Sequence, residues 1–129
     1  MNENFVPYEL SIKLKEKGFN RPCCGYYHIG KGDDSFETCI NSDFLNSLNE
    51  YRVGAPTIPH VLKWLREEKN ILVCVLPTGW NHARECSLYY YVVYDTTNYF
   101  WKREEYQQSI ETYEEAELAG IEYVLNNWI

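Results

Sequence analysis

The chain has 129 residues, of which 45% are apolar and 24% are charged, and its net charge is −7 at neutral pH. This length suits one domain with one core, and the composition lies in the globular range, away from disordered chains. The acidity is uneven: residues 1–70 carry nine Lys and Arg against ten Asp and Glu, whereas residues 71–129 carry three against nine. Because duplex nucleic acids are bound by cations that replace phosphate counterions, the charge argues against such a ligand.

Nothing in the sequence predicts a membrane segment or an export signal. The longest apolar run extends from Ile71 to Leu76, whereas a membrane helix needs about 18 to 20 apolar residues. The start, from Met1 to Phe5, lacks both a basic region and an apolar region. We therefore expect a cytoplasmic protein with no membrane partner.

The cysteines predict neither a disulfide framework nor a metal site. Their number is odd, and Cys23 and Cys24 are adjacent, which is a poor geometry for bonding to each other. We expect reduced thiols, mostly buried. The five residues are Cys23, Cys24, Cys39, Cys74 and Cys86.

In the first half, Pro7 opens a helical pattern over residues 7–17, and Gly18 ends it. The next segment, residues 23–29, is predicted to be a strand. The turn residues 31–34 and the alternation over 36–40 predict an extended return, so that these two segments form a hairpin. Asp43 is a candidate cap for a short helix, 52–56 reads as a loop, and the stripe from Ile58 to Leu65 predicts a helix that Asn70 ends.

In the second half, the β-branched run from Ile71 to Leu76 is typical of a central strand covered on both faces, and 77–87 reads as a long loop. Residues 88–94 form the strongest predicted strand, and 99–102 return, which gives a three-stranded antiparallel meander. Thr112 and Glu115 form a capping box for a final helix with an apolar stripe. Its members are Leu118, Ile121, Val124, Leu125 and Trp128.

These elements predict a single compact α+β domain over residues 1–129. Its central antiparallel sheet would have four or five strands, packed by the first, middle and last helices.

Three segments carry a resemblance to a known family: Phe5–Leu10, Lys13–Phe19 and Thr112–Ile121, with Ala55–Pro56 and Trp64–Glu67 between them. They resemble a family of small uncharacterised proteins common in gut Bacteroidetes and in their prophages and conjugative elements. The similarity covers nearly the whole chain. The resemblance implies a bacterial cytoplasmic protein with an accessory role on a mobile element, and it carries over no catalytic residue.

Catalytic and metal-binding patterns are weak. His82 and Cys86, with Cys23 and Cys24, lack the two close ligand pairs that structural zinc uses, so we predict no metal and no cofactor. A cysteine nucleophile would need a histidine beside it in the fold, and the carboxylates of the last third read as solvated charge. A small hydrolase using a cysteine or a carboxylate therefore remains the alternative function.

The preferred function is a non-enzymatic binding module that acts on a host component or sequesters a small anionic, nucleotide-like ligand. The predicted ligand groups combine aromatic rings with cationic or hydrogen-bonding side chains; they are Tyr27, His28, Lys31, Trp80, His82 and Arg84. Within 88–94, Tyr89, Tyr91 and Val93 share one strand face, which we predict as the interface of a homodimer. Two alternatives stay open: helices could cover both faces, and Trp80 could fold onto the core.

Overall fold

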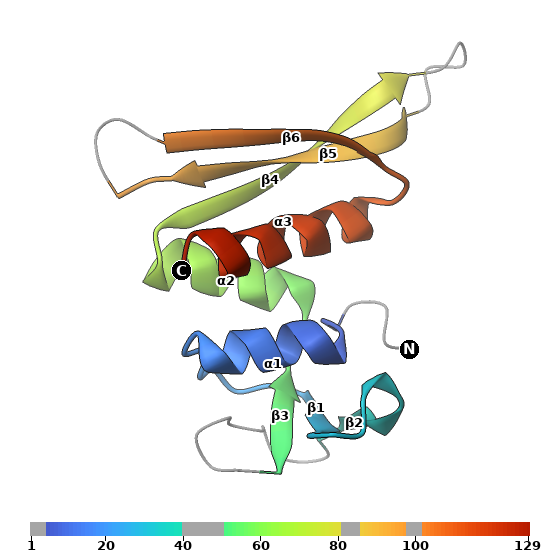
Figure 1. The fold of residues 1–129 in the computed structure, drawn as a ribbon, viewed down its shortest axis with the longest axis vertical. Coiled ribbons are helices and arrows are strands. Elements are labelled where there is room, and N and C mark those ends of the chain that lie inside the picture. Colours follow the sequence, from blue (N-terminus) through green and yellow to red (C-terminus); the bar gives the residue numbers. More distant parts are fainter. Residues whose placement is uncertain (1–4, 40–50, 81–85, 98–101) are drawn as a thin grey trace. The chain divides into compact units, whose positions relative to one another are not determined.

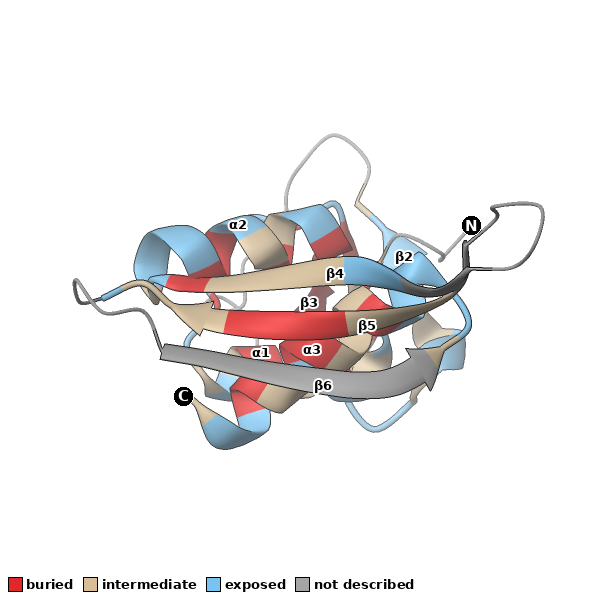
Figure 2. Ribbon diagram, turned by 90° about the horizontal axis from the view of Figure 1, so that it is seen from above, coloured by how far each residue is buried: buried red, intermediate tan, exposed pale blue. Residues whose placement is uncertain are grey.

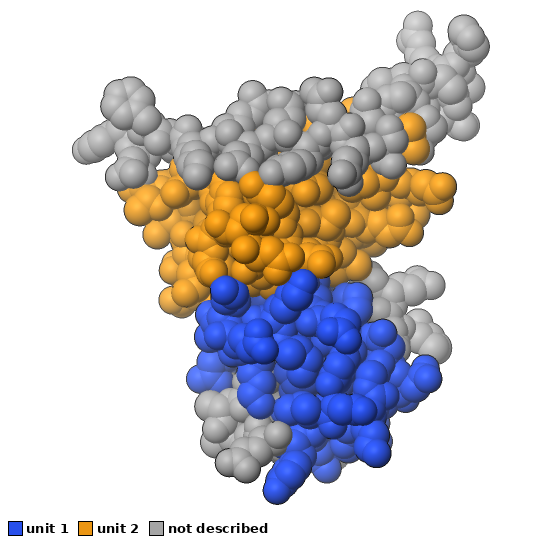
Figure 3. All heavy atoms as spheres, viewed as in Figure 1, with its two compact units in different colours: residues 1–60 blue, residues 61–129 orange. Residues whose placement is uncertain are grey.

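The structure, a computed structural model, describes residues 5–39, 51–80, 86–97 and 102–129, with the side chains of 78–80, 86–87 and 102–109 left out (Figure 1). By its internal contacts the chain divides into two compact units, residues 1–60 and residues 61–129 (Figure 3). Each unit has its own three-stranded antiparallel sheet. The α+β class and the three α-helices agree with the sequence prediction, but the strands form two sheets instead of one central sheet of four or five strands.

The first helix, α1 (Tyr8–Glu16), is confirmed together with the signal that ends it. Gly18 adopts a φ of +91°, a left-handed conformation that costs glycine little. The amide of Phe19 donates to the carbonyl of Leu14 at 2.9 Å, and the amide of Gly18 donates to that of Lys15 at 3.2 Å. These two bonds form a Schellman motif, and Phe19 folds back to a buried position.

The sheet of the first unit has the order β2-β1-β3, with β1 (Gly25–His28) in the centre. The predicted hairpin is confirmed, because β2 (Glu37–Thr38) pairs with β1 after the 3-10 turn η1 (Asp33–Ser35). The prediction of a loop over 52–56 was wrong: β3 (Arg52–Ala55) pairs with all four residues of β1. The short helix predicted from Asp43 lies outside the described residues.

The core of the first unit forms where α1 packs on this sheet. Tyr27, Val53 and Ala55 are buried there, with Phe36 among the aromatic residues packed against them. Gly25 leaves room for this packing, because a Cβ would lie 2.7 Å from the Phe36 ring and the ring would have to move.

The middle helix is confirmed as α2 (Ile58–Glu68), and it crosses the boundary between the two units. Asn70 follows it with a φ of +55°, a conformation that asparagine tolerates better than most residues. This turn leads directly into the first strand of the second sheet.

The second sheet has the order β4-β5-β6: β4 (Ile71–Trp80), β5 (Cys86–Asp95) and β6 (Lys102–Ile110). The three-stranded antiparallel meander is confirmed, but its third strand begins at Lys102, where the predicted return over 99–102 ends, and residues 99–101 lie outside the described residues. Two expectations were wrong. The run from Ile71 lies in an edge strand instead of a central one, and the predicted loop over 77–87 is shorter because β4 continues to Trp80 and β5 begins at Cys86. An edge strand accommodates Pro77, because one row of its backbone groups needs no ladder partner.

The last helix, α3 (Tyr113–Asn127), is capped as predicted: the Thr112 Oγ1 accepts a hydrogen bond from the Glu115 amide at 3.1 Å. α3 packs on β5 and β4 through buried residues of its apolar stripe, which include Ile121, Val124 and Leu125. The sequence pattern places Glu117 on the solvent side of the helix, but this residue is half-buried. Its burial, and then the charge of Glu114, raises the pKa of the Glu117 carboxyl group. None of the described helices has the length and apolarity to cross a membrane.

Candidate functional site

The first candidate surface is the side of the β2-β1-β3 sheet that faces away from Tyr27 and the core. Alternation along β1 places Tyr26 and His28 on this side, and the strand register places Glu37 and Arg52 opposite them. The same alternation adds Cys24 and Cys39 from the strand ends. We call this set the polar face; it consists of Cys24, Tyr26, His28, Glu37, Cys39 and Arg52.

Glu37 links two members of the polar face. The Tyr26 hydroxyl donates to the Glu37 Oε2 at 2.5 Å, and the His28 Nε2 lies 3.5 Å from the same oxygen. The hydrogen bond from Tyr26, and then that from His28, lower the pKa of the Glu37 carboxyl group. The same bond to Glu37, and then burial, raise the pKa of Tyr26. Glu37 therefore stays ionised and Tyr26 stays protonated at neutral pH.

Arg52 lies over the ring of Tyr26 on the same side of the sheet. The guanidinium carbon lies 4.9 Å from the centroid of the Tyr26 ring, in the range of a cation–π contact. The register places Gly54 opposite Tyr26, so no side chain from that position covers the ring. The ring of His28 contacts Tyr26 edge-on with the centroids 5.6 Å apart.

The second candidate surface belongs to the β4-β5-β6 sheet. One side of this sheet packs on α3: a Cβ built on Gly120 of the helix would meet Val73 and Tyr91, and Tyr89 and Tyr91 contact the rings of Tyr113 and Tyr123. Figure 2 looks onto the opposite side, with α3 behind the strands. By alternation and register this opposite side carries seven described residues, which we call the outer face: Leu72, Cys74, Leu76, Leu88, Tyr90, Val92 and Tyr94.

The outer face is partly exposed. Leu76 is 36% exposed and Val92, on the central strand, is fully buried, while the other five residues are intermediate. Burial raises the pKa of the Cys74 thiol, so this side chain stays neutral. The described side chains of the outer face therefore present apolar and aromatic surface without a charge.

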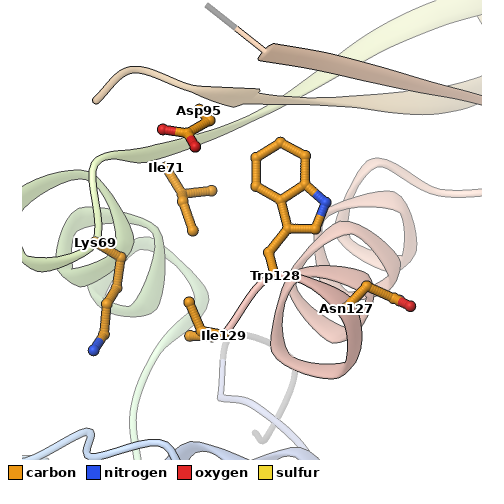
Figure 4. Close-up of a pocket in the computed structure, with 6 residues that line it drawn as sticks. All are labelled: Lys69, Ile71, Asp95, Asn127, Trp128 and Ile129. Atoms are coloured by element: carbon orange, nitrogen blue, oxygen red, sulfur yellow. The ribbon is translucent and has the colours of Figure 1, made fainter. Parts of the chain in front are cut away.

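A third feature is a hollow at the end of the second unit. It has a volume of about 220 Å³ and is lined by Lys69, Ile71, Asp95, Asn127, Trp128 and Ile129 (Figure 4). Its charged groups already have structural contacts, because Asp95 accepts a hydrogen bond from the Thr97 amide at 2.9 Å and the Lys69 ammonium lies 5.5 Å from the Trp64 ring. The hollow offers no set of converging polar groups.

The chain matches no protein-family model, no curated protein and no solved structure. Its chemistry is therefore argued from its own residues.

The predicted ligand groups occupy different places. Tyr27 is in the core of the first unit, His28 lies on the polar face, and Lys31 is exposed in the turn after β1. The side chain of Trp80, together with His82 and Arg84, lies outside the described residues. The structure thus brings none of the described members together as a ligand pocket.

The predicted interface residues lie on the side of the sheet that α3 covers. Tyr91 is 6% exposed, Val93 is fully buried and Tyr89 is half-buried beside Tyr113. The exposed aromatic surface anticipated from the sequence is therefore on the other side of β5, at Tyr90 and Tyr94. Alternation identified the two sides of the strand but did not indicate which one the helix covers.

A cysteine–histidine pair does not form on the polar face. Cys24 lies in the bend before β1 and His28 is the last residue of that strand, so the length of β1, about 10 Å at about 3.3 Å per residue, lies between them. His60 instead stacks edge-on with Phe19 at 5.6 Å. Among the residues that the structure describes, no three His, Cys, Asp or Glu side chains are grouped to hold a metal ion.

Sequence reasoning missed most of the polar face. Tyr26 and His28 could have been paired by their spacing of two along a predicted strand. Arg52 could not, because its segment reads as a loop. Glu37 was placed on a return strand, but its register against Tyr26 depends on the turn geometry of η1.

Tyr27 has a structural role that can be tested at high pH. Its hydroxyl donates to the carbonyl oxygen of Val6 at 2.6 Å, and burial raises its pKa to about 12 from an ordinary value of 10.0. The folded state therefore keeps a proton that the unfolded state loses between these values, so this contribution to stability is complete below pH 10 and falls as the pH rises to about 12.

We expect Tyr27→Phe to lower the free energy of unfolding at pH 7 by about 1–3 kcal/mol, because the buried carbonyl of Val6 loses its donor. We also expect the variant to lose less stability than the wild type above pH 10. Urea denaturation at both pH values measures this, with Tyr51→Phe, at a residue that is 78% exposed, as the control. Equal stability of the two variants would contradict the assignment.

Proposed function

We propose that this protein is a non-enzymatic interaction module that forms a two-fold homodimer through its outer face. The observation that supports this best is the contrast between the two sides of the β4-β5-β6 sheet. α3 covers one side, while the other carries seven uncharged and mainly apolar or aromatic residues, of which all but the buried Val92 keep exposed surface. Surfaces of this kind are uncommon on monomers and are typical of interfaces.

An uncharged patch allows a second copy of this acidic chain to dock. The chain carries a net charge of −7, so two copies repel each other overall. The described side chains of the outer face add nothing to this repulsion. A two-fold axis buries the same patch on both copies, and tyrosine is enriched in such interfaces.

The test is a charge placed on the outer face. We expect Leu76→Glu to convert the dimer to a monomer, because a buried carboxylate without a partner costs several kcal/mol in an apolar interface. Light scattering after size-exclusion chromatography at micromolar concentration would measure a mass halved to about that of the 15.3 kDa chain. Leu76 is partly exposed at the edge strand, so the monomer should keep its circular dichroism spectrum and its cooperative unfolding.

Tyr51→Glu is the matched control, because it adds the same charge at an exposed aromatic residue of the first unit. Its mass should equal that of the wild type. A Leu76→Glu variant that keeps the wild-type mass would overturn the proposal, as would dissociation of the Tyr51→Glu variant.

The other functions considered from the sequence have less support. The polar face combines Arg52 and His28 with the ionised Glu37, which opposes binding of a small anion. The hydrolase lacks a described cysteine beside a described histidine on this face. If the partner were a host component, that component would occupy the same outer face, and the protein would bind it as a monomer.

A further inference from the structure

Two cysteines of the first unit lie opposite each other at the open end of the β1–β2 pair. The register Tyr26 to Glu37 and Gly25 to Thr38 extends by one step to Cys24 and Cys39. The Cys39 amide donates to the Cys24 carbonyl at 2.7 Å, which is one of the two bonds of a hydrogen-bonded cross-strand pair. Such pairs have Cα atoms about 5.5 Å apart. Disulfides most often span about 5.5–6 Å between Cα atoms.

Cys24 lies in the bend just before β1 and Cys39 just after β2, and strand alternation assigns both side chains to the same side of the sheet. Cys24 is two residues before Tyr26 and Cys39 is two residues after Glu37, and the side chains of Tyr26 and Glu37 meet on the polar face. An independent indication is that the Cys39 thiol contributes to the raised pKa of Tyr26, so it lies near that phenol. Cys24 is exposed and Cys39 is half-buried, and both are thiols.

The neighbouring Cys23 differs in each respect. Its side chain is buried on the opposite side of the strand, and its Sγ donates to the carbonyl of Arg21 at 3.3 Å. Adjacent cysteines on opposite sides of a strand cannot join without distortion of the backbone. Cys23 is therefore the natural control for any reaction assigned to Cys24.

We propose that Cys24 and Cys39 form a reversible dithiol–disulfide site that exchanges with small disulfides such as oxidised glutathione. The exposed Cys24 thiolate attacks one sulfur of oxidised glutathione, forming a mixed disulfide and releasing one glutathione thiolate. Cys39, after losing its proton, attacks the Cys24 sulfur, forms the Cys24–Cys39 bond and releases the second glutathione. The chain loses two hydrogens and two electrons, and one oxidised glutathione becomes two reduced molecules.

This reaction is independent of the homodimer. It joins β1 to β2 beside the Tyr26–Glu37 bond, so it would fix the hairpin that presents the polar face. The hairpin is paired by backbone hydrogen bonds while both cysteines are thiols. The site is thus a modification site and not a structural disulfide.

The experiment uses the full chain with oxidised glutathione at pH 8, followed by alkylation of remaining thiols, trypsin digestion and mass spectrometry without reduction. Trypsin cuts after Lys17, Lys31 and Arg52 and leaves the Arg21–Pro22 bond, so residues 18–31 and 32–52 become separate peptides. We expect these two peptides to be joined in most molecules, with no glutathione retained. Reduced glutathione in excess should separate them.

Three variants assign the bond. Cys39→Ser should stop at the mixed disulfide and keep one glutathione on Cys24, whereas Cys24→Ser should leave the two peptides unjoined. Cys23→Ala should still join them. A wild-type chain that retains glutathione, or a bond that survives in Cys24→Ser, would overturn the proposal, as would a bond that forms only between two chains.

Discussion

Replacing Ile121 with alanine should lower the free energy of unfolding by about 2–5 kcal/mol. Ile121 has no exposed surface and lies in the middle of α3, the helix that covers one side of the β4-β5-β6 sheet. Removing its side chain takes apolar contacts away and leaves a cavity that the rigid sheet cannot close. Urea denaturation followed by circular dichroism measures the loss.

Glu122→Ala is the matched control, because the next residue of the same helix is exposed. Its cost should stay within about 0.5 kcal/mol. Similar losses for the two variants would mean that the buried side of α3 is misassigned.

Adding one methyl group at Gly120 should destabilise the protein by about 1–3 kcal/mol, even though alanine favours a helix more than glycine does. A Cβ at this position would lie 2.6 Å from the Cγ1 of Val73 and 3.4 Å from the Tyr91 ring. The helix must then move away from the sheet, which weakens the packing along α3. The same denaturation experiment measures the effect.

A second substitution identifies the cause. If the clash with Val73 causes the loss, Gly120→Ala should lower the free energy of unfolding less in a Val73→Ala background than in the wild type. Additive losses in the double variant would contradict this account. Asn126→Ala, at an exposed position of α3, should be close to neutral.

The elements that sequence reasoning predicted correctly carry local signals. Gly18 and Phe19 end α1, Thr112 begins α3, and the tyrosine-rich run forms β5, because each signal depends on residues within one turn or one strand. Boundaries were less accurate where tertiary context decides. Pro77 reads as the end of a strand, yet an edge position allows β4 to continue for three more residues, to Trp80.

The arrangement of the strands could not be read in the same way. Alternation of apolar residues gives the two sides of a strand but not its neighbour in the sheet. The four residues from Arg52 to Ala55 are too few to show a pattern, so their pairing with β1, and with it the separate β2-β1-β3 sheet, was missed. For the same reason, the exposed aromatic surface was expected on the Tyr91 side of β5 and is found on the Tyr90 side. The sequence does not show on which of these two sides α3 packs.

The candidate surfaces follow from these pairings. His28 was selected from the sequence, but its partners Glu37 and Arg52 come from two other strands and depend on the register of each. Cys24 and Cys39 have no motif spacing, and only the hairpin register brings them opposite each other. Sequence reasoning therefore predicts the residue types at these surfaces better than their combinations.

The mass of the wild-type chain in solution tests the central claim most directly. Sedimentation equilibrium over a range of micromolar concentrations should give about twice the 15.3 kDa chain mass. Dilution should shift the distribution toward the monomer, while Leu76→Glu should be monomeric throughout. A wild-type mass of one chain at every concentration would contradict the homodimer.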